Sequence, residues 1–425
     1  MIALAALALA RPDSRSSIDS ETHPLRCHWD ATADLAQCAA VLGYAEAAWD
    51  AQVGTLGFRA PPSDGGEGGS DALDLYLGTS ETGGAGEAWV DCDGGDPHCV
   101  DSDGADGLAR ASSYVVVDAR TPAADMEGYV THELNHTLQY GTDYAEPFLA
   151  VWEGTAVAAE VWTLGTADAS QVADYQATPW LSAVLQDGYF LDEQYDIWSW
   201  YEYGAVTWVL WMDERYGGDG AIGPLLWETM SQEGYGDEPD VLDAWEEISG
   251  LPWETELREY ALWRAALADG DDIGPWVGAA SEAWREGTID AAGEYTPEWP
   301  LFPMGMAVWE VEGFDNCGSS FEVSGDGRFD ILYVREPAAA KYMVACTPIR
   351  AVAVVSFGPE DLDADDSLEA ATFTLKVTGT PKNAIGCGCG SGAAPGMAPL
   401  LLALAAYRSR KIRSSPNRIP ASATT

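Results

Sequence analysis

A glutamate flanked by two histidines four residues apart stands in the H-E-x-x-H segment formed by His132, Glu133 and His136. Because an α-helix has about 3.6 residues per turn, imidazoles at positions i and i+4 point to the same side and can bind one zinc ion. Glu133 would then lie where it can take a proton from water. Apolar residues recur at four-residue spacing through the same segment, at Met126, Val130, Leu134 and Leu138. The pattern predicts a helical zinc site of hydrolytic type, the alternative being a chance match on a surface helix.

A zinc ion that hydrolyses bonds needs three protein ligands and one open position. The next predicted helix carries Glu153, 17 residues after His136, as a candidate for the third ligand. Glu160, two turns further along the same face, is the alternative ligand, or an acidic residue that does not touch the metal.

The segments that carry these residues resemble the gluzincin branch of metallopeptidases. Residues 113–140 and 148–160 look like the peptidase-MA-like and hyicolysin-like groups of secreted metalloproteases, in which H-E-x-x-H on one helix is followed by a glutamate ligand on the next. The similarity extends over about residues 30–265, but only residues 113–160 are specific. The gap to Glu153 is shorter than in the best-known gluzincins. The resemblance implies a zincin-like fold and one catalytic Zn²⁺. It also implies that His132, His136 and Glu153 are the metal ligands and that Glu133 is the general base.

Peptide hydrolysis also needs a group that stabilises the developing oxyanion. No histidine follows His136, so a tyrosine would have to take this role. The segment that starts at Tyr201 looks like a stretch that follows the metal helices in similar proteins. We expect Tyr203 to be the catalytic tyrosine, with Tyr201 as the second choice and aromatic packing in a helix as the alternative.

The composition excludes some partners and suggests a compartment. A formal net charge of −48, from 69 acidic and 21 basic residues, repels phosphate backbones and argues against nucleic-acid binding. Eight cysteines occur in local pairs, which suggests disulfides in an exported protein. The closest pairs are Cys27 with Cys38, Cys92 with Cys99, Cys317 with Cys346, and Cys387 with Cys389. A thiolate zinc site at the last pair is the competing interpretation.

Two further features bear on binding. The Asp/Gly-rich loop at 91–107 has the carboxylates that Ca²⁺ prefers but lacks the EF-hand pattern, so a solvated acidic loop is the stronger interpretation. The 18 tryptophans could stack on sugars, but we expect most of them to pack in the core.

The ends of the chain resemble export and sorting signals. Residues 1–10 are apolar and end in Ala8-Leu9-Ala10, typical of a signal peptide, with a buried helix as the alternative. Residues 386–425 contain a Cys motif, a short apolar run and a basic cluster, and resemble the MYXO-CTERM tag of myxobacterial surface proteins. That resemblance implies processing of the tag at the membrane and retention at the cell surface. A frayed terminus is the alternative.

Periodicity predicts an α+β protein. Residues 11–30 are expected to be a linker and residues 31–298 a zincin-like domain, with strands at 73–77 and 113–118. Its expected helices are 32–56, 121–140, 146–162, 169–186, 201–216, 222–232, 239–249 and 253–268. Residues 299–385 are expected to form an all-β module of sandwich type. Its expected strands are 307–311, 329–334, 342–346, 351–357 and 371–377.

Together these features predict a secreted or cell-surface zinc endopeptidase that acts on proteins or peptides. Two alternatives stay open. One is a non-catalytic surface adhesin on a zincin scaffold, in which the β module binds the partner. The other is a zinc amidase that acts on a non-peptide amide.

Overall fold

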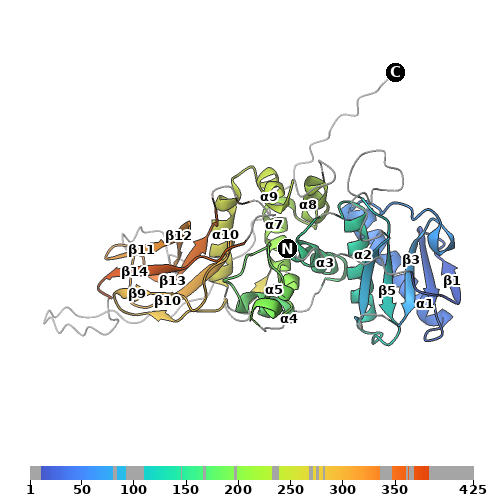
Figure 1. The fold of residues 1–425 in the computed structure, drawn as a ribbon, viewed down its shortest axis with the longest axis horizontal. Helices are drawn as coiled ribbons and strands as arrows, with labels where there is room; N and C mark the ends of the chain where they lie inside the picture. The colour runs from blue at the N-terminus through green and yellow to red at the C-terminus, as the bar shows by residue number, and fades with distance from the viewer. Residues whose placement is uncertain are drawn as a thin grey trace, which may run out of the picture. The chain divides into compact units, whose positions relative to one another are not determined.

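The protein is described by a computed structural model, in which residues 1–382 form one compact unit. The described residues are 11–79, 84–91, 110–144, 146–165, 169–195, 199–231, 239–267, 271–273, 277–280, 283–335, 347–359, 362 and 368–381. Helices and strands alternate in blocks along the chain, so the fold class is α+β (Figure 1). In the described part of the chain, no helix combines the length and apolar character needed to span a bilayer.

A five-stranded sheet forms the N-terminal part, in the order β1-β2-β3-β5-β4. Strands β2, β3 and β5 are parallel, and the two edge strands run antiparallel to their neighbours. The strands are β1 (Ser16–Asp19), β2 (Leu25–Trp29), β3 (Leu73–Gly78), β4 (Gly86–Val90) and β5 (Ser113–Asp118). β3 and β5 match the predicted strands at 73–77 and 113–118. Both are buried along nearly their whole length, as apolar runs in parallel sheets usually are.

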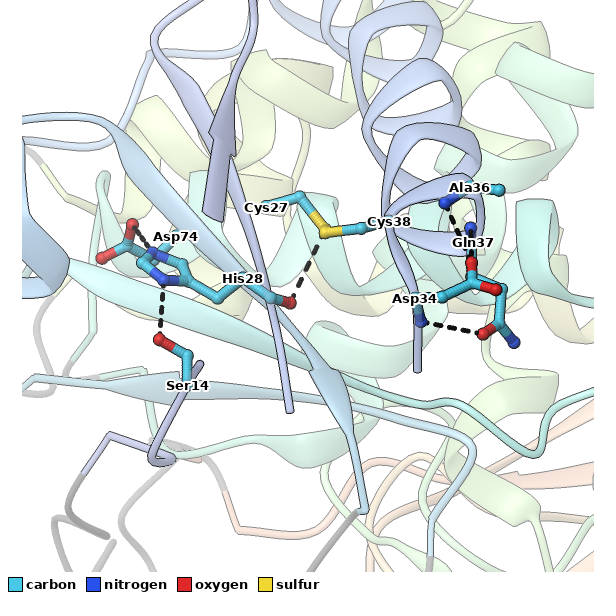
Figure 2. Close-up of a disulfide and its surroundings, with 8 residues drawn as sticks. All are labelled: Ser14, Cys27, His28, Asp34, Ala36, Gln37, Cys38 and Asp74. Atoms are coloured by element: carbon cyan, nitrogen blue, oxygen red, sulfur yellow. Dashed lines mark hydrogen bonds and ion pairs between the residues drawn. A yellow bond between two sulfur atoms is a disulfide. The ribbon is translucent and has the colours of Figure 1, made fainter. Parts of the chain in front are cut away.

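β1 and β2 lie in the segment that the sequence suggests is a linker. Leu25 and Cys27 are fully buried in the core beneath the sheet, which explains why this polar-looking segment is ordered as strands. A disulfide joins Cys27 to Cys38 of helix α1 (Leu35–Trp49), one of the pairs that are close in the sequence (Figure 2). Asp34 caps this helix by accepting hydrogen bonds from the backbone N–H groups of Ala36 and Gln37.

α1 continues into a π-helical segment, η1 (Asp50–Leu56), so the helix predicted at 32–56 is present with a change of pitch at its end. Together with helix α2 (Met126–Tyr140), α1 packs against the sheet. Val41 and Ala45 of α1 and Val130 of α2 join Leu75 and Val115 of the sheet in one buried cluster. This core fixes the side of α2 that faces the sheet.

The start of α2 differs from the prediction that Thr121 caps a helix beginning at Pro122. Thr121 instead donates its backbone N–H to Asp118 and its hydroxyl to the carbonyl oxygen of Ala85. Its side chain therefore ties the end of β5 to the segment before β4, and the helix begins only at Met126. Gly141 ends the helix, as expected.

The helical block follows α2, and most of its members match the predicted ranges. α3 ends at Gly165, whose φ of 76° suits glycine at this position. The helix predicted at 169–186 is wrong in its second half, because the chain reaches Pro179 and α4 stops at Ala177. The helices are α3 (Leu149–Leu164), α4 (Ala169–Ala177), α5 (Gly188–Tyr195), α6 (Tyr201–Gly204), α7 (Val206–Met212), η3 (Asp213–Gly217), α8 (Ile222–Met230), α9 (Val241–Ser249) and α10 (Trp253–Ala266). A short 3-10 turn, η2 (Glu67–Gly69), precedes β3.

Strands dominate again toward the C-terminus, in sheets ordered β12-β13-β10-β8 and β11-β14-β9 and a separate β6-β7 pair. Aromatic pairs such as Trp309 with Phe373, 6.0 Å between ring centres, join the two larger sheets. The strands are β6 (Asp271–Ile273), β7 (Val277–Ala280), β8 (Thr288–Ile289), β9 (Gly293–Tyr295), β10 (Met306–Val311), β11 (Ser319–Gly325), β12 (Phe329–Arg335), β13 (Ile349–Ser356) and β14 (Phe373–Gly379). β8 and β9 precede residue 299, and the domain boundary placed there stays a prediction.

Several predictions fall on residues outside the described ranges. They are the signal peptide at 1–10, nearly all of the acidic loop at 91–107 with its Ca²⁺ and Cys92–Cys99 hypotheses, the strand at 342–346, and the C-terminal segment at 386–425. Cys317 is disulfide-bonded, but its predicted partner Cys346 lies outside those ranges as well.

Candidate metal centre

The H-E-x-x-H segment lies in the middle of α2, as the periodicity predicts. His132, Glu133 and His136 are all buried, and the ring centres of the two histidines are 4.7 Å apart. Leu134, between them in sequence, packs into the core against the sheet. The apolar face of the helix thus fixes its rotation and leaves the imidazoles toward α3.

α3 places Glu153 beside both histidines. One ligand atom from each of His132, His136 and Glu153 lies within 4.8 Å of the others. Gly154, the next residue, allows α3 to pack closely on α6, because a Cβ atom there would lie 3.0 Å from Ala205. The three residues expected as metal ligands are therefore together in the structure, and we call them the triad.

A half-buried glutamate and a buried glutamine hold the outer nitrogens of the histidines. Glu160 lies 2.7 Å from His132 Nδ1, and Gln139 Oε1 lies 2.6 Å from His136 Nδ1. Gln139 also donates from Nε2 to the backbone carbonyl of Trp152 at 3.0 Å. Because that carbonyl can only accept, the oxygen of Gln139 must face His136, and His136 must carry its proton on Nδ1. The carboxylate of Glu160 imposes the same tautomer on His132.

With the Nδ1 protons placed in this way, the inner nitrogens carry no hydrogen atom whenever the imidazoles are neutral, as metal binding requires. His132 Nε2 lies 3.1 Å from His136 Nε2 and 2.9 Å from Glu153 Oε2, and the distance from His136 Nε2 to that oxygen is 3.4 Å. Three electron-pair donors this close repel one another unless a cation neutralises them. A single proton can serve one of these contacts at a time, whereas a metal ion can bind all three atoms.

The pKa shifts of the triad residues also indicate a site that attracts positive charge. Burial lowers the pKa of His132, but its hydrogen bonds with Glu153 and Glu160 outweigh burial and raise the pKa well above its usual range. Burial raises the pKa of Glu153, but the two imidazoles outweigh it and hold the pKa well below its usual range. The chemistry of the donor set, two imidazole nitrogens and one carboxylate oxygen, suits a divalent transition metal.

Glu133 lies next to the triad and against the edge strand β4. A Cβ atom on Gly86 would lie 2.8 Å from Glu133 Cγ, so the close approach of strand and helix requires glycine at this position. In the described part of the chain, no side chain or backbone group forms a hydrogen bond with the Glu133 carboxylate. Burial raises the pKa of Glu133, and the two imidazoles offset part of this rise. A carboxylate with such surroundings is suited to accept a proton from a reactant.

The two candidate tyrosines have different positions. The ring of Tyr203 stacks on that of His132, with 5.8 Å between centres and 24° between planes. Tyr201 is fully buried and donates its hydroxyl to the carbonyl oxygen of Ser182, away from the triad. Of the two, Tyr203 alone contacts a residue of the triad, while its role as a catalytic group stays a prediction.

Glu160 contacts His132 through Nδ1, which matches the alternative of an acid that supports the site from outside.

Sequence reasoning missed Gln139 and Tyr140. Gln139 follows His136 by three residues, so helical spacing alone places it beside the imidazole, and this signal could have identified it. Tyr140 packs against Trp152, and its pKa is raised by burial and then by Glu133 and Glu153. Its proximity to both acids depends on how α2 and α3 pack, which the sequence does not reveal.

Comparison of the chain with protein-family models and with curated proteins finds no match. The function must therefore be inferred from the geometry of the triad, the residues that orient it and the strand beside it.

Proposed function

We propose that the protein is a zinc-dependent endopeptidase whose metal ligands are His132, His136 and Glu153. The convergence of three electron-pair donors, with both imidazoles oriented from outside by Glu160 and Gln139, is the observation that supports this proposal most strongly. A buried site of this kind is costly to maintain unless a cation occupies it.

A bound zinc ion would polarise the substrate carbonyl and make a water molecule more acidic. Glu133 accepts the proton of the attacking water and later delivers it to the leaving amine, for which its burial and raised pKa are suited. Tyr203 is the proposed donor to the developing oxyanion, because its ring lies against His132. Glu160 and Gln139 hold the imidazoles in their metal-binding tautomers.

The edge strand favours a peptide substrate. Among the described residues, β4 is an edge strand of the five-stranded sheet. It pairs with β5 along one side, and no strand pairs with its other side. An extended peptide can add to such an edge through backbone hydrogen bonds, and Gly86 brings this edge against the proposed general base. This arrangement supports the finer fold assignment that we propose, a zincin-like lobe within residues 31–298 followed by a sandwich-like module at 299–385.

The proposed location is outside the cell or at its surface. The Cys27–Cys38 disulfide supports export, because structural disulfides persist in oxidising compartments. The signal peptide and the sorting tag remain part of the proposal on the basis of sequence resemblance alone.

The test is proteolysis of casein by the zinc-loaded protein and its Glu133→Gln variant. We expect cleavage by the wild type, a loss of about 10²–10⁴-fold in the variant, and one zinc per chain in both. A wild type that binds zinc but cleaves cell-wall amides rather than casein would favour the amidase alternative. Equal cleavage by both proteins would refute the role of Glu133.

A further inference from the structure

The surroundings of the triad are rich in carboxylates. Besides Glu153 and Glu160, Glu133 lies beside the triad. Glu87 follows Gly86 on β4, where strand alternation turns its side chain to the face away from α2, so it adds negative charge near the site without contacting the triad. The ion pairs of Glu153 and Glu160 are with histidine, and no described arginine or lysine pairs with Glu133, Glu153 or Glu160. The four carboxylates outweigh the two charges of a divalent ion, so the site stays negative with the metal bound.

Exposed aromatic rings lie at the same site. Trp200 is 47% exposed, and its ring meets Tyr203 edge to face at 5.4 Å, while Tyr203 in turn stacks on His132. Tyr129 is 42% exposed and precedes His132 by three residues, so it lies one turn away on the same helix face. Large aromatic side chains are seldom left in water next to a reactive centre unless they contact a ligand.

Carboxylates and aromatic faces together recognise one class of side chain. A guanidinium or ammonium group is attracted to the face of tryptophan or tyrosine and to a negative field, whereas a neutral ring gains only the stacking contact. Anionic substrates would be repelled both by the site and by a chain with a net charge of −48.

We propose that this centre selects peptides with an arginine or lysine side chain close to the scissile bond, with Trp200 as the aromatic platform and Glu87 as part of the attracting field. This inference rests on the proposed peptidase function and adds a substrate class to it. Trp200 acts as a specificity residue and takes no part in the chemical step.

The test compares three quenched-fluorescence peptides that differ at one position, which holds arginine, its neutral isostere citrulline, or phenylalanine. We expect the zinc-loaded protein to cleave the arginine peptide with kcat/KM about tenfold higher than the citrulline peptide. The preference should shrink several-fold in Trp200→Ala and in Glu87→Gln, and it should decrease as ionic strength rises. Trp284→Ala is the matched control, because Trp284 is 46% exposed but belongs to the segment before β8.

Binding of the same peptides to zinc-loaded Glu133→Gln, measured by calorimetry, separates the two proposals. If the wild type cleaves all three peptides equally well, or prefers phenylalanine, the specificity inference is overturned and the peptidase proposal stands. If the wild type cleaves none but Glu133→Gln binds the arginine peptide selectively, the specificity inference stands and the peptidase proposal fails. Absence of both cleavage and selective binding overturns the inference. Loss of preference in Trp284→Ala to the same extent as in Trp200→Ala would also contradict it.

Discussion

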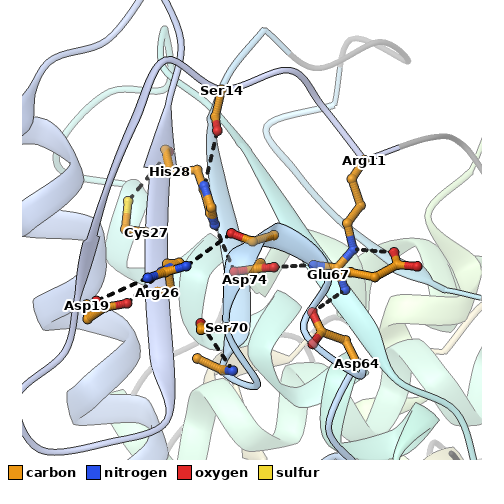
Figure 3. A network of polar contacts seen from close by, with 12 residues as sticks. Arg11, Ser14, Asp19, Arg26, Cys27, His28, Asp64, Glu67, Ser70 and Asp74 are labelled. Atoms are coloured by element: carbon orange, nitrogen blue, oxygen red, sulfur yellow. Dashed lines mark hydrogen bonds and ion pairs between the residues drawn. The ribbon is translucent and has the colours of Figure 1, made fainter.

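The triad between α2 and α3 and a second cluster on the N-terminal sheet both gather buried acids around histidine, but they are neutralised differently. In the second cluster, Asp74 is fully buried and contacts His28, and the guanidinium of Arg11 pairs with Asp74 and Asp64 (Figure 3). Arg11 also forms two hydrogen bonds with Asp91, at 2.7 and 2.9 Å. This cluster contains its own cation.

Among the described residues no arginine or lysine pairs with the triad, and the partners of its imidazoles are carboxylates and an amide that orient the rings. A third way of neutralising a buried acid is found at Glu202. Burial is the main cause that raises its pKa to about 8, so that it stays protonated at neutral pH. At these two places a buried carboxylate is neutralised by arginine or by a proton, and the contrast supports the proposal that the triad binds an external ion.

The largest expected effect is from removal of the internal cation. Arg11→Met should lower the free energy of unfolding by about 3–5 kcal/mol, because Asp74 and Asp91 would stay buried without their partner. Chemical denaturation measures this loss. Arg26→Met is the control, since its partner Asp19 is 61% exposed, and it should cost less than about 1 kcal/mol. Equal losses in the two variants would contradict the account of the Arg11 cluster.

Because Glu202 keeps its proton in the folded state, the free energy of unfolding should depend on pH. The folded state raises the pKa of Glu202 from 4.5 to about 8, so the folded state keeps a proton that the unfolded chain loses. The stabilisation is complete below pH 4.5 and is lost as the pH rises toward 8, by up to about 1.4 kcal/mol per pH unit. Glu202→Gln should remove this slope in the metal-free protein. Parallel curves for the variant and the wild type, recorded by denaturation from pH 4 to 9, would show that the carboxyl group does not titrate in this way.

The tautomer argument predicts a smaller effect on metal affinity. Gln139→Ala should weaken zinc binding by about 10–100-fold, because His136 loses the acceptor that orients its ring. Gln139→Glu keeps an acceptor at this position and should restore most of the affinity. Asn135→Ala is the matched control, since Asn135 is equally buried in α2 but donates to Gln52, away from the triad. Competition titration with a chromophoric chelator measures all three. Equal weakening in Asn135→Ala would mean that helix stability, and not the orientation of His136, is responsible.

The smallest effect concerns the proposed oxyanion donor. Tyr203→Phe keeps the ring that stacks on His132 and removes only the hydroxyl, so kcat should fall by about tenfold or more with little change in zinc affinity. Tyr140→Phe tests the other tyrosine near Glu133. A larger loss of kcat in Tyr140→Phe than in Tyr203→Phe would transfer the role to Tyr140.

The sequence predicted the parts of the site that depend on local spacing. The helical position of His132 and His136 follows from periodicity, and the helix predicted at 146–162 matches α3 to within a few residues. Cys27 and Cys38 are close in the sequence, but their disulfide could not be deduced from spacing alone. Glu153 was predicted by resemblance and spacing together, and the structure places it beside both histidines.

Features that depend on long-range contacts were missed. The start of α2 is set by the hydrogen bond from Thr121 to Ala85, which is 36 residues away, so local capping rules placed it too early. β11 has mostly exposed or half-buried side chains and lacks an apolar pattern, and it is ordered by pairing with β14. The second cluster depends on Arg11 meeting acids 53 or more residues later, which no local pattern indicates.

The central claim is that the triad binds a metal ion through three side chains. The most direct measurement is metal content by inductively coupled plasma mass spectrometry of the purified protein, its Glu153→Ala variant and its Glu160→Gln variant after dialysis against trace zinc. The account predicts one zinc per wild-type chain, loss or strong weakening in Glu153→Ala, and weaker but measurable binding in Glu160→Gln. A wild type that stays free of zinc, or a Glu153→Ala variant that binds it as tightly as the wild type, would contradict the account.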